Sequence, residues 1–112
     1  MTTPLYDPGW LRHRVTVESA AGAPDGAGGE EDVAWDTVAT LWANISPASA
    51  GEEIIAGHLS GVVTHEITFR WRGDLAGGMR VAYRGRTFRL LAVHDPDETR
   101  RYLVARATEA AP

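Results

Sequence analysis

The chain has no cysteine and no lysine, and it has no long apolar run. The absence of cysteine excludes a disulfide framework, a thiolate metal site and a cysteine nucleophile. It does not indicate whether the protein works in an oxidising or a reducing compartment. No stretch approaches the ~20 apolar residues of a membrane-spanning helix, so we expect no membrane contact. The first ten residues, MTTPLYDPGW, lack a basic region followed by an apolar run, and we therefore expect no export signal.

The remaining composition suits one globular domain. The chain has 112 residues, of which 44% are hydrophobic and 23% are charged, which favours one core over two domains or a disordered tail. We expect a single domain over residues 1–112, with residues 1–9 extended or disordered. The run of Gly, Ala and acids at 20–33 predicts a long mobile hairpin loop.

The net charge of −4 is unevenly distributed. All 11 basic residues are Arg; residues 15–69 hold nine acids and no base, whereas residues 70–112 hold nine Arg and five acids. Such asymmetry allows opposite surfaces to meet copies of the same chain or different partners. Simple solubility, with a coding bias towards Arg and Ala, explains it equally well. The negative total disfavours a free-standing nucleic-acid binder, which usually carries a basic face.

Alternating apolar and polar residues predict six strands. We expect them at residues 13–19, 35–45, 62–72, 79–84, 87–93 and 102–108. Arg84-Gly85 is expected to form a tight hairpin turn, because Gly supplies the positive φ that such a turn needs. The predicted fold class is all-β, a small six-stranded antiparallel β-barrel or compact sandwich with a long Gly-rich hairpin loop, since closure removes exposed edges.

The mid-chain segment at 47–61 interrupts this pattern. Pro47 ends the preceding strand, and Ile54, Ile55 and Leu59 have a spacing that a helix would place on one face. Several glycines weaken that helix. We therefore predict a loop or a short helix here.

Four histidines raise the question of a metal or catalytic site. His13, His58, His65 and His94 show no metal-ligand spacing. His65 falls on the apolar face of its strand, which is typical of a core or interface histidine, and the run from His94 to Glu98 has the composition of a turn. The chain also lacks a nucleophile elbow and a phosphate-binding loop. We expect no enzyme, no catalytic residue, no metal and no cofactor.

Aromatic residues interleaved with Arg are compatible with a base-stacking platform. On the clearest predicted strand, however, alternation turns the aromatic side chains away from the Arg side chains. We therefore assign the aromatics to the core and the arginines to a wet or inter-subunit face, since Arg pairs well with carboxylates at interfaces. The candidate subunit-interface residues are Arg70, Arg72, Arg84, Arg86 and Arg89.

A series of short motifs runs in a fixed order along residues 10–109. The motifs are Leu11-Arg12-His13-Arg14-Val15, Trp35, Val38 to Ile45 with Pro47, Glu53 and Ala56, Thr64 to Arg70, Met79-Arg80-Val81, Tyr83 to Arg86 with Phe88, Pro96-Asp97-Glu98, and Arg101-Tyr102-Leu103. Through them the chain resembles the head-tail joining proteins (head-completion, stopper or adaptor proteins) of tailed bacteriophages and of gene transfer agents.

That resemblance implies a structural role with no catalytic residues. It implies a homo-oligomeric ring of 6 or 12 copies in the neck of a virion or phage-like particle, after assembly in the bacterial cytoplasm. The ring would contact a portal or adaptor ring on the head side and a tail terminator or tail tube on the other. It would close the exit of packaged DNA, without sequence specificity, and dock the tail.

The acidic, Gly-punctuated segment between two firm strands is our candidate for the channel loop. We expect Gly51, Glu52, Glu53, Gly57 and His58 to project into the channel, where carboxylates repel the duplex. The alternative function is a small nucleic-acid-binding β-barrel, which salt-dependent binding to single strands would favour.

Overall fold

The computed structural model describes residues 8–20, 34–48, 53–56 and 59–110. Each of the six predicted strands is present, and the described residues contain no α-helix. The elements are a 3-10 helix η2 (Pro8–Trp10) and the strands β1 (His13–Ala20), β2 (Trp35–Pro47), β3 (Glu53–Ala56), β4 (Leu59–Val62), β5 (His65–Arg70), β6 (Arg80–Tyr83), β7 (Arg86–His94) and β8 (Tyr102–Glu109). None of the helices in this part of the chain is long and apolar enough to cross a membrane.

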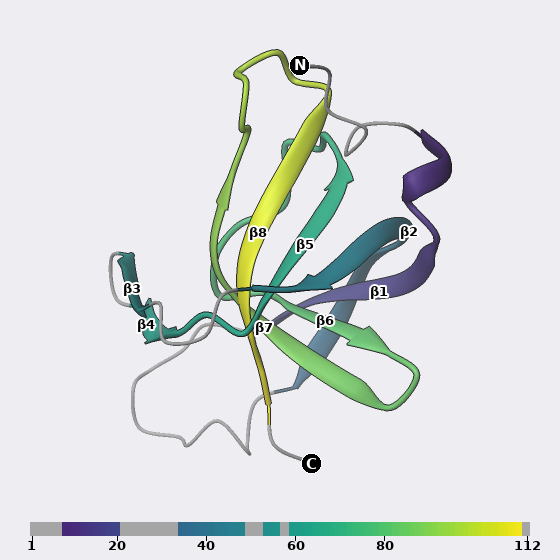
Figure 1. Ribbon diagram of the computed structural model, residues 1–112. Coiled ribbons are helices and arrows are strands. Elements are labelled where there is room, and N and C mark those ends of the chain that lie inside the picture. Colours follow the sequence, from purple (N-terminus) through teal and green to yellow (C-terminus); the bar gives the residue numbers. More distant parts are fainter. Residues whose placement is uncertain (1–7, 21–33, 49–52, 57–58, 111–112) are drawn as a thin grey trace.

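Six strands close into a barrel in the order β1-β2-β5-β8-β7-β6 (Figure 1). Every neighbouring pair is antiparallel, including the seam between β6 and β1. The seam has the short register Thr16–Ala82, Val17–Val81 and Glu18–Arg80. The all-β barrel predicted from alternation is confirmed, and its main sheet has no open edge.

Inward-facing apolar side chains from each barrel strand form the core. Val15 and Val17 of β1 and Ile67 and Phe69 of β5 belong to one core cluster, and all four are almost completely buried. Burying a large side chain of this kind contributes roughly 1.5–3 kcal/mol. The other core residues are Ala43, Leu75, Val81, Phe88, Leu90, Leu103, Ala105 and Ala107.

The β6–β7 hairpin has the predicted two-residue turn. Arg84 has a φ of 49° and Gly85 a φ of 80°, so both central residues are left-handed, as the twist of a tight hairpin requires. The prediction at Arg84-Gly85 is confirmed.

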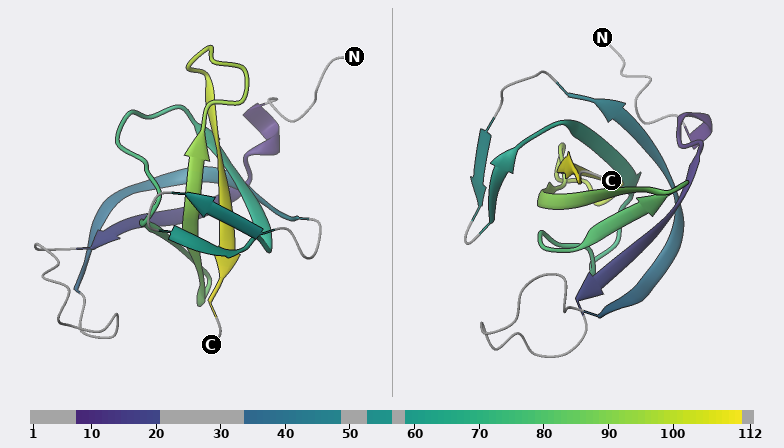
Figure 2. Two further views of the ribbon diagram at one scale, coloured as in Figure 1. Left: turned by 90° about the vertical axis from the view of Figure 1, so that its left-hand side faces the viewer. Right: turned by 90° about the horizontal axis from the view of Figure 1, so that it is seen from below.

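The mid-chain segment differs from the prediction of a loop or a short helix. Its described residues form a β-hairpin in which β3 pairs antiparallel with β4. The hairpin stands outside the barrel and lies against β7 (Figure 2). Strand alternation places Ile54 on the inner, half-buried face and leaves Ile55 78% exposed on the outer face. The helical spacing was therefore misleading.

Leu91 is the reason that this hairpin packs on the barrel. It is the extra residue of a bulge in β7, between the pairs Leu90–Ala107 and Ala92–Arg106. A bulge re-aims a side chain, and Leu91 is buried outside the core cluster. A Cβ built on Gly61 of β4 would lie 3.3 Å from Leu91 Cδ1, so the hairpin backbone contacts Leu91 closely.

Candidate functional site

Arginines and tryptophans gather where β5 ends and β8 begins. One hollow there is lined by Arg70, Trp71, Arg100, Arg101 and Tyr102. An adjoining hollow is lined by Arg14, Thr40, Leu41, Trp42, Arg70, Trp71 and Arg72. Because the two hollows share Arg70 and Trp71, they form one continuous surface. We call Arg14, Trp42, Arg70, Trp71, Arg72, Arg100 and Arg101 the Arg–Trp surface.

Two guanidinium groups of this surface lie over indole rings. The Arg14 guanidinium carbon is 5.1 Å from the Trp42 ring centroid, and that of Arg100 is 5.6 Å from the Trp71 centroid. These distances are within the range of a cation–π contact. Trp42 remains 52% exposed. The surface therefore presents positive charge beside a large accessible aromatic side chain.

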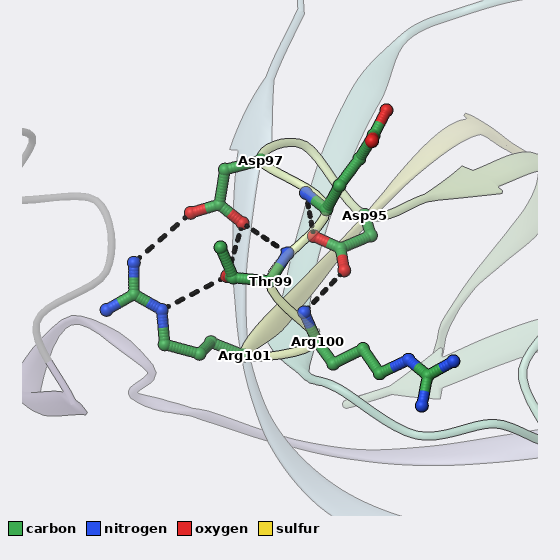
Figure 3. Close-up of polar contacts among 6 residues, drawn as sticks. Asp95, Asp97, Thr99, Arg100 and Arg101 are labelled. Carbon is green, nitrogen blue, oxygen red and sulfur yellow. Dashed lines mark hydrogen bonds and ion pairs between the residues drawn. The ribbon is translucent and has the colours of Figure 1, made fainter.

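The turn between β7 and β8 is fixed by two aspartates (Figure 3). Asp95 accepts hydrogen bonds from the backbone N–H groups of Glu98 (2.8 Å) and Arg100 (2.6 Å). Asp97 accepts from the N–H of Thr99 (3.2 Å) and from its hydroxyl (2.6 Å). The Thr99 hydroxyl bond is the main cause that lowers the pKa of Asp97 below its ordinary value.

These bonds hold a strained backbone. Glu98 and Arg100 both have a φ of 60°, a left-handed conformation that costs roughly 1–2 kcal/mol for a residue with a side chain. In Figure 3 the side chains of Arg100 and Arg101 point to opposite sides of the turn. Arg101 is held by Asp97 at 3.3 Å and donates to Thr99 Oγ1 at 3.1 Å. The turn thus fixes the backbone of Arg100 and holds the side chain of Arg101.

Of the predicted interface arginines, Arg70 and Arg72 belong to the Arg–Trp surface. Arg72 makes a two-pronged pair with Asp74 of the same chain, at 3.0 and 2.8 Å, and this hydrogen bonding is the main cause that lowers the pKa of Asp74. Arg70 is exposed, and within the described part of the chain no carboxylate pairs with it. Arg70 is therefore a better candidate than Arg72 for a contact with another molecule.

The other predicted interface arginines lie elsewhere, so the structure does not bring the five together. Arg84 is exposed at the β6–β7 turn and lies over Tyr83 at 5.3 Å. Arg86 is paired with Glu109 at 2.8 and 3.0 Å. Arg89 is half-buried in a third hollow, which Trp35 also lines.

Trp71 is partly a core residue, as alternation predicted, since it packs against the barrel core. Sequence reasoning missed its second role, in which the same ring lines both hollows beside Arg70. The strand was expected to continue to residue 72, but β5 ends at Arg70. Alternation therefore predicted that Trp71 packs on the core but not its contact with Arg100, which comes from a distant turn.

Four of the five channel-loop candidates, Gly51, Glu52, Gly57 and His58, lie outside the described residues. Glu53, the fifth, is exposed at the first position of β3. On β4, its register partner Val62 is 46% exposed. The outer face of the hairpin is therefore accessible and carries both an acid and apolar side chains.

His65 is half-buried on β5, with its ring edge-on to Phe88 at a centroid distance of 5.1 Å. Burial is the main cause that lowers the pKa of His65; the charge of Arg86 lowers it further, and the charge of Glu109 raises it. Its Nδ1 lies 2.9 Å from Thr64 Oγ1. These contacts give His65 a structural environment. No group of potential metal ligands occurs among the residues that the structure describes.

Comparisons with known proteins agree with this fold. A family model described as phage head completion protein matches residues 6–110. A chain from the virion of a native gene transfer agent particle is 25% identical, with a TM-score of 0.66 and coverage of 91% of this chain and 97% of that chain. Protein SF1141 from Shigella flexneri 2a is 27% identical, with a TM-score of 0.66 and coverage of 94% and 97%. The search of curated proteins found no match. Since the family model spans nearly the whole chain, the chain belongs to the phage head completion protein family.

Proposed function

We propose that copies of this chain form a ring between the portal or adaptor and the tail, close the DNA exit channel after packaging, and provide the surface on which the tail docks. As a family member, the chain is a structural component of a virion or gene-transfer-agent particle. The observation that carries the proposal is the family match over residues 6–110. We assign no enzymatic activity to it, because the family is structural. The ring has 6 or 12 copies in this proposal, with packaged DNA passing through it without sequence specificity.

The closed barrel supports assembly through side chains. Its main sheet offers no open edge to a neighbouring strand, so barrels in a ring meet through surface groups. We keep the predicted arginines as subunit-interface candidates, with Arg70 and Arg84 first because no carboxylate within the described residues pairs with them. Arg72 and Arg86 would first have to exchange their own partners, Asp74 and Glu109.

The β3–β4 hairpin supports the proposed channel contact. It projects from the barrel and begins with the exposed Glu53. Cationic side chains in the channel would neutralise DNA phosphates, release counterions and so increase the affinity for DNA, which would slow its passage. Carboxylates do not bind phosphates and do not slow the DNA in this way. We therefore propose that residues 51–61 face the channel. A particle structure with Glu53 on the outer wall of the ring would refute this part of the proposal.

The decisive experiment compares particles assembled with and without the chain. Particles that lack it are expected to lose packaged DNA to nuclease and to carry no tails, as measured by nuclease protection and electron microscopy. Retained DNA together with attached tails would overturn the proposal.

A small nucleic-acid-binding barrel remains the second candidate, and the Arg–Trp surface is the observation that favours it. Single-stranded nucleic acid is bound by cationic grooves with aromatic stacking platforms. This function predicts affinity for single strands that falls steeply with salt. Ring formation without such affinity would reject it.

A further inference from the structure

We infer that the Arg–Trp surface is the docking site for the acidic segment 21–33 of a second copy of this chain. That segment contains Asp25, Glu30, Glu31 and Asp32 and no basic residue. The inference rests on the proposed ring and assigns one of its contacts to two named parts of the chain. A contact between two different surfaces of identical copies is head-to-tail, the kind that generates a ring when the rotation closes.

Three cations of the surface are available for a partner. Within the described residues, no carboxylate pairs with Arg14, Arg70 or Arg100. Two of them, Arg14 and Arg100, instead lie over Trp42 and Trp71, which leaves their charge uncompensated. A guanidinium fork binds carboxylates with two parallel hydrogen bonds. The surface therefore has unmet capacity for acidic groups.

The backbone of the turn that carries Arg100 is preorganised for binding. Asp95 binds the backbone N–H of both left-handed residues, Glu98 and Arg100, and thereby maintains a conformation that the residues would not adopt alone. Strained backbone persists where surrounding contacts determine it, and such sites are often binding sites. A backbone that is fixed before binding loses little conformational entropy when the contact forms, which favours an association contact.

The residue types of the surface favour a protein partner. Asp74 and Asp97 already pair with Arg72 and Arg101, which leaves Arg14, Arg70 and Arg100 to bind the acids of the segment. Trp and Arg are also the residues most enriched at protein interface hot spots.

The length of the segment favours a second copy over the same copy. Its ends are fixed at Ala20 and Trp35, which are partners on β1 and β2. Arg14 lies six residues from Ala20 along β1, roughly 20 Å away at ~3.3 Å per residue. Half of the intervening segment, seven residues, spans at most roughly 24 Å. Reaching its own surface would need nearly full extension in both directions, whereas a neighbouring barrel removes that requirement.

The first test measures binding of a synthetic peptide of residues 20–34 to the full chain by fluorescence anisotropy. Arg70→Glu is expected to weaken binding by about tenfold or more, because it converts an attraction into a repulsion. Arg84→Glu is the matched control, because Arg84 is exposed at the β6–β7 turn and does not line either hollow that this peptide is proposed to occupy. Any ring contact of Arg84 would involve another part of the neighbouring copy, so binding of this peptide should not change. A second peptide, with the four acids replaced by Asn or Gln, should bind much more weakly.

Several outcomes would overturn the inference. Equal binding of the acidic and neutral peptides would do so, as would equal effects of Arg70→Glu and Arg84→Glu. Stronger binding of a single-stranded oligonucleotide or a DNA duplex, lost in Arg70→Glu, would identify the surface as a nucleic-acid site instead. Circular dichroism on each variant verifies that the exposed substitutions leave the barrel folded.

The second test separates this inference from the proposed function. Particles are assembled with an Arg70→Glu, Arg100→Glu variant or with a variant neutralised at Asp25, Glu30, Glu31 and Asp32. Both variants should fail to form complete rings in electron micrographs. Complete rings with both variants would refute the contact and leave the neck function standing, whereas DNA retention in particles lacking the chain would refute the function itself.

Discussion

A single carboxylate, that of Asp95, holds the shape of the β7–β8 turn. It accepts the N–H groups of Glu98 and Arg100, both at positive φ. Asp95→Ala removes both acceptors, and we expect the free energy of unfolding to fall by about 1–3 kcal/mol. Urea denaturation measures this loss. Glu98→Gln is the control, because it keeps the backbone of the turn and changes an exposed side chain; an equal loss in this variant would contradict the role of Asp95.

His65 predicts a dependence of stability on pH. Burial, the main cause, lowers its folded pKa below the ordinary value of 6.5, and Arg86 adds to this while Glu109 opposes it. The unfolded chain therefore takes up the proton first. Stability from this group is complete above pH 6.5 and is lost as the pH falls through the folded pKa. We expect urea midpoints to fall between about pH 7 and pH 5, and to fall less in His65→Gln; identical profiles would contradict the prediction.

At the same scale, sequence reasoning selected Arg70 and Arg72 but not the other residues of the Arg–Trp surface. Alternation separates aromatic from Arg side chains only within a regular strand. Trp71 follows the last residue of β5, and Arg100 reaches it from a turn 29 residues later in the chain. Contacts of this kind depend on tertiary structure, so no local pattern predicts them.

The barrel strands could be predicted from the sequence because, in much of each strand, apolar residues that face the core alternate with polar residues. Val15 and Val17, for example, alternate with polar residues and point into the core. The β3–β4 hairpin was not predicted because its stability depends on a tertiary contact and not on a local pattern. It is stabilised by a contact with Leu91, a bulge residue on the outside of the barrel, and its glycines weaken any local signal.

Gly77, between β5 and β6, tests how closely the chain packs where the hairpin meets β7. A Cβ at this position would lie 2.9 Å from Leu59 Cδ1 and 2.9 Å from the Leu91 carbonyl oxygen. The second contact is with backbone and is not relieved by a side-chain rotation. We expect Gly77→Ala to lower the free energy of unfolding by about 1–3 kcal/mol, measured in urea.

Gly73→Ala is the matched control for that substitution. Its Cβ would meet only the Trp71 ring, at 3.4 Å, which is an ordinary contact distance. If both alanine variants lost the same stability, close packing at Gly77 would not be the cause.

For the molecule as a whole, barrel closure is weakest where β6 meets β1. Three residue pairs join these strands, against six between β5 and β8. The ion pair Glu18–Arg80 (2.7 Å) and the stacking of Arg80 over Trp35 (4.2 Å) secure one end of the short seam. Amide hydrogens across the β1–β6 seam are therefore expected to exchange with solvent faster than those across β5–β8.

A pair of substitutions checks this order of opening by hydrogen exchange. Glu18→Gln should speed exchange at the short seam by about twofold to fivefold, as expected for loss of a partly buried ion pair. Glu66→Gln, which removes the equivalent 2.8 Å pair with Arg106 on the longer β5–β8 seam, should change exchange at the short seam little. Uniform protection around the barrel would contradict the prediction.

The barrel holds both ends of the segment that carries the β3–β4 hairpin, and this affects how the segment can evolve. Pro47 pairs with His65, and the Ala48 N–H donates to the Thr64 carbonyl at 2.9 Å, so the two ends of the intervening segment are held together by the barrel itself. The segment between them can therefore change in length or charge while its attachment points stay fixed. Lineages that share one barrel can in this way adapt the exposed outer face of the segment, which includes Ile55 and Val62, to different particles, because substitutions there need no compensating change where the hairpin packs on Leu91.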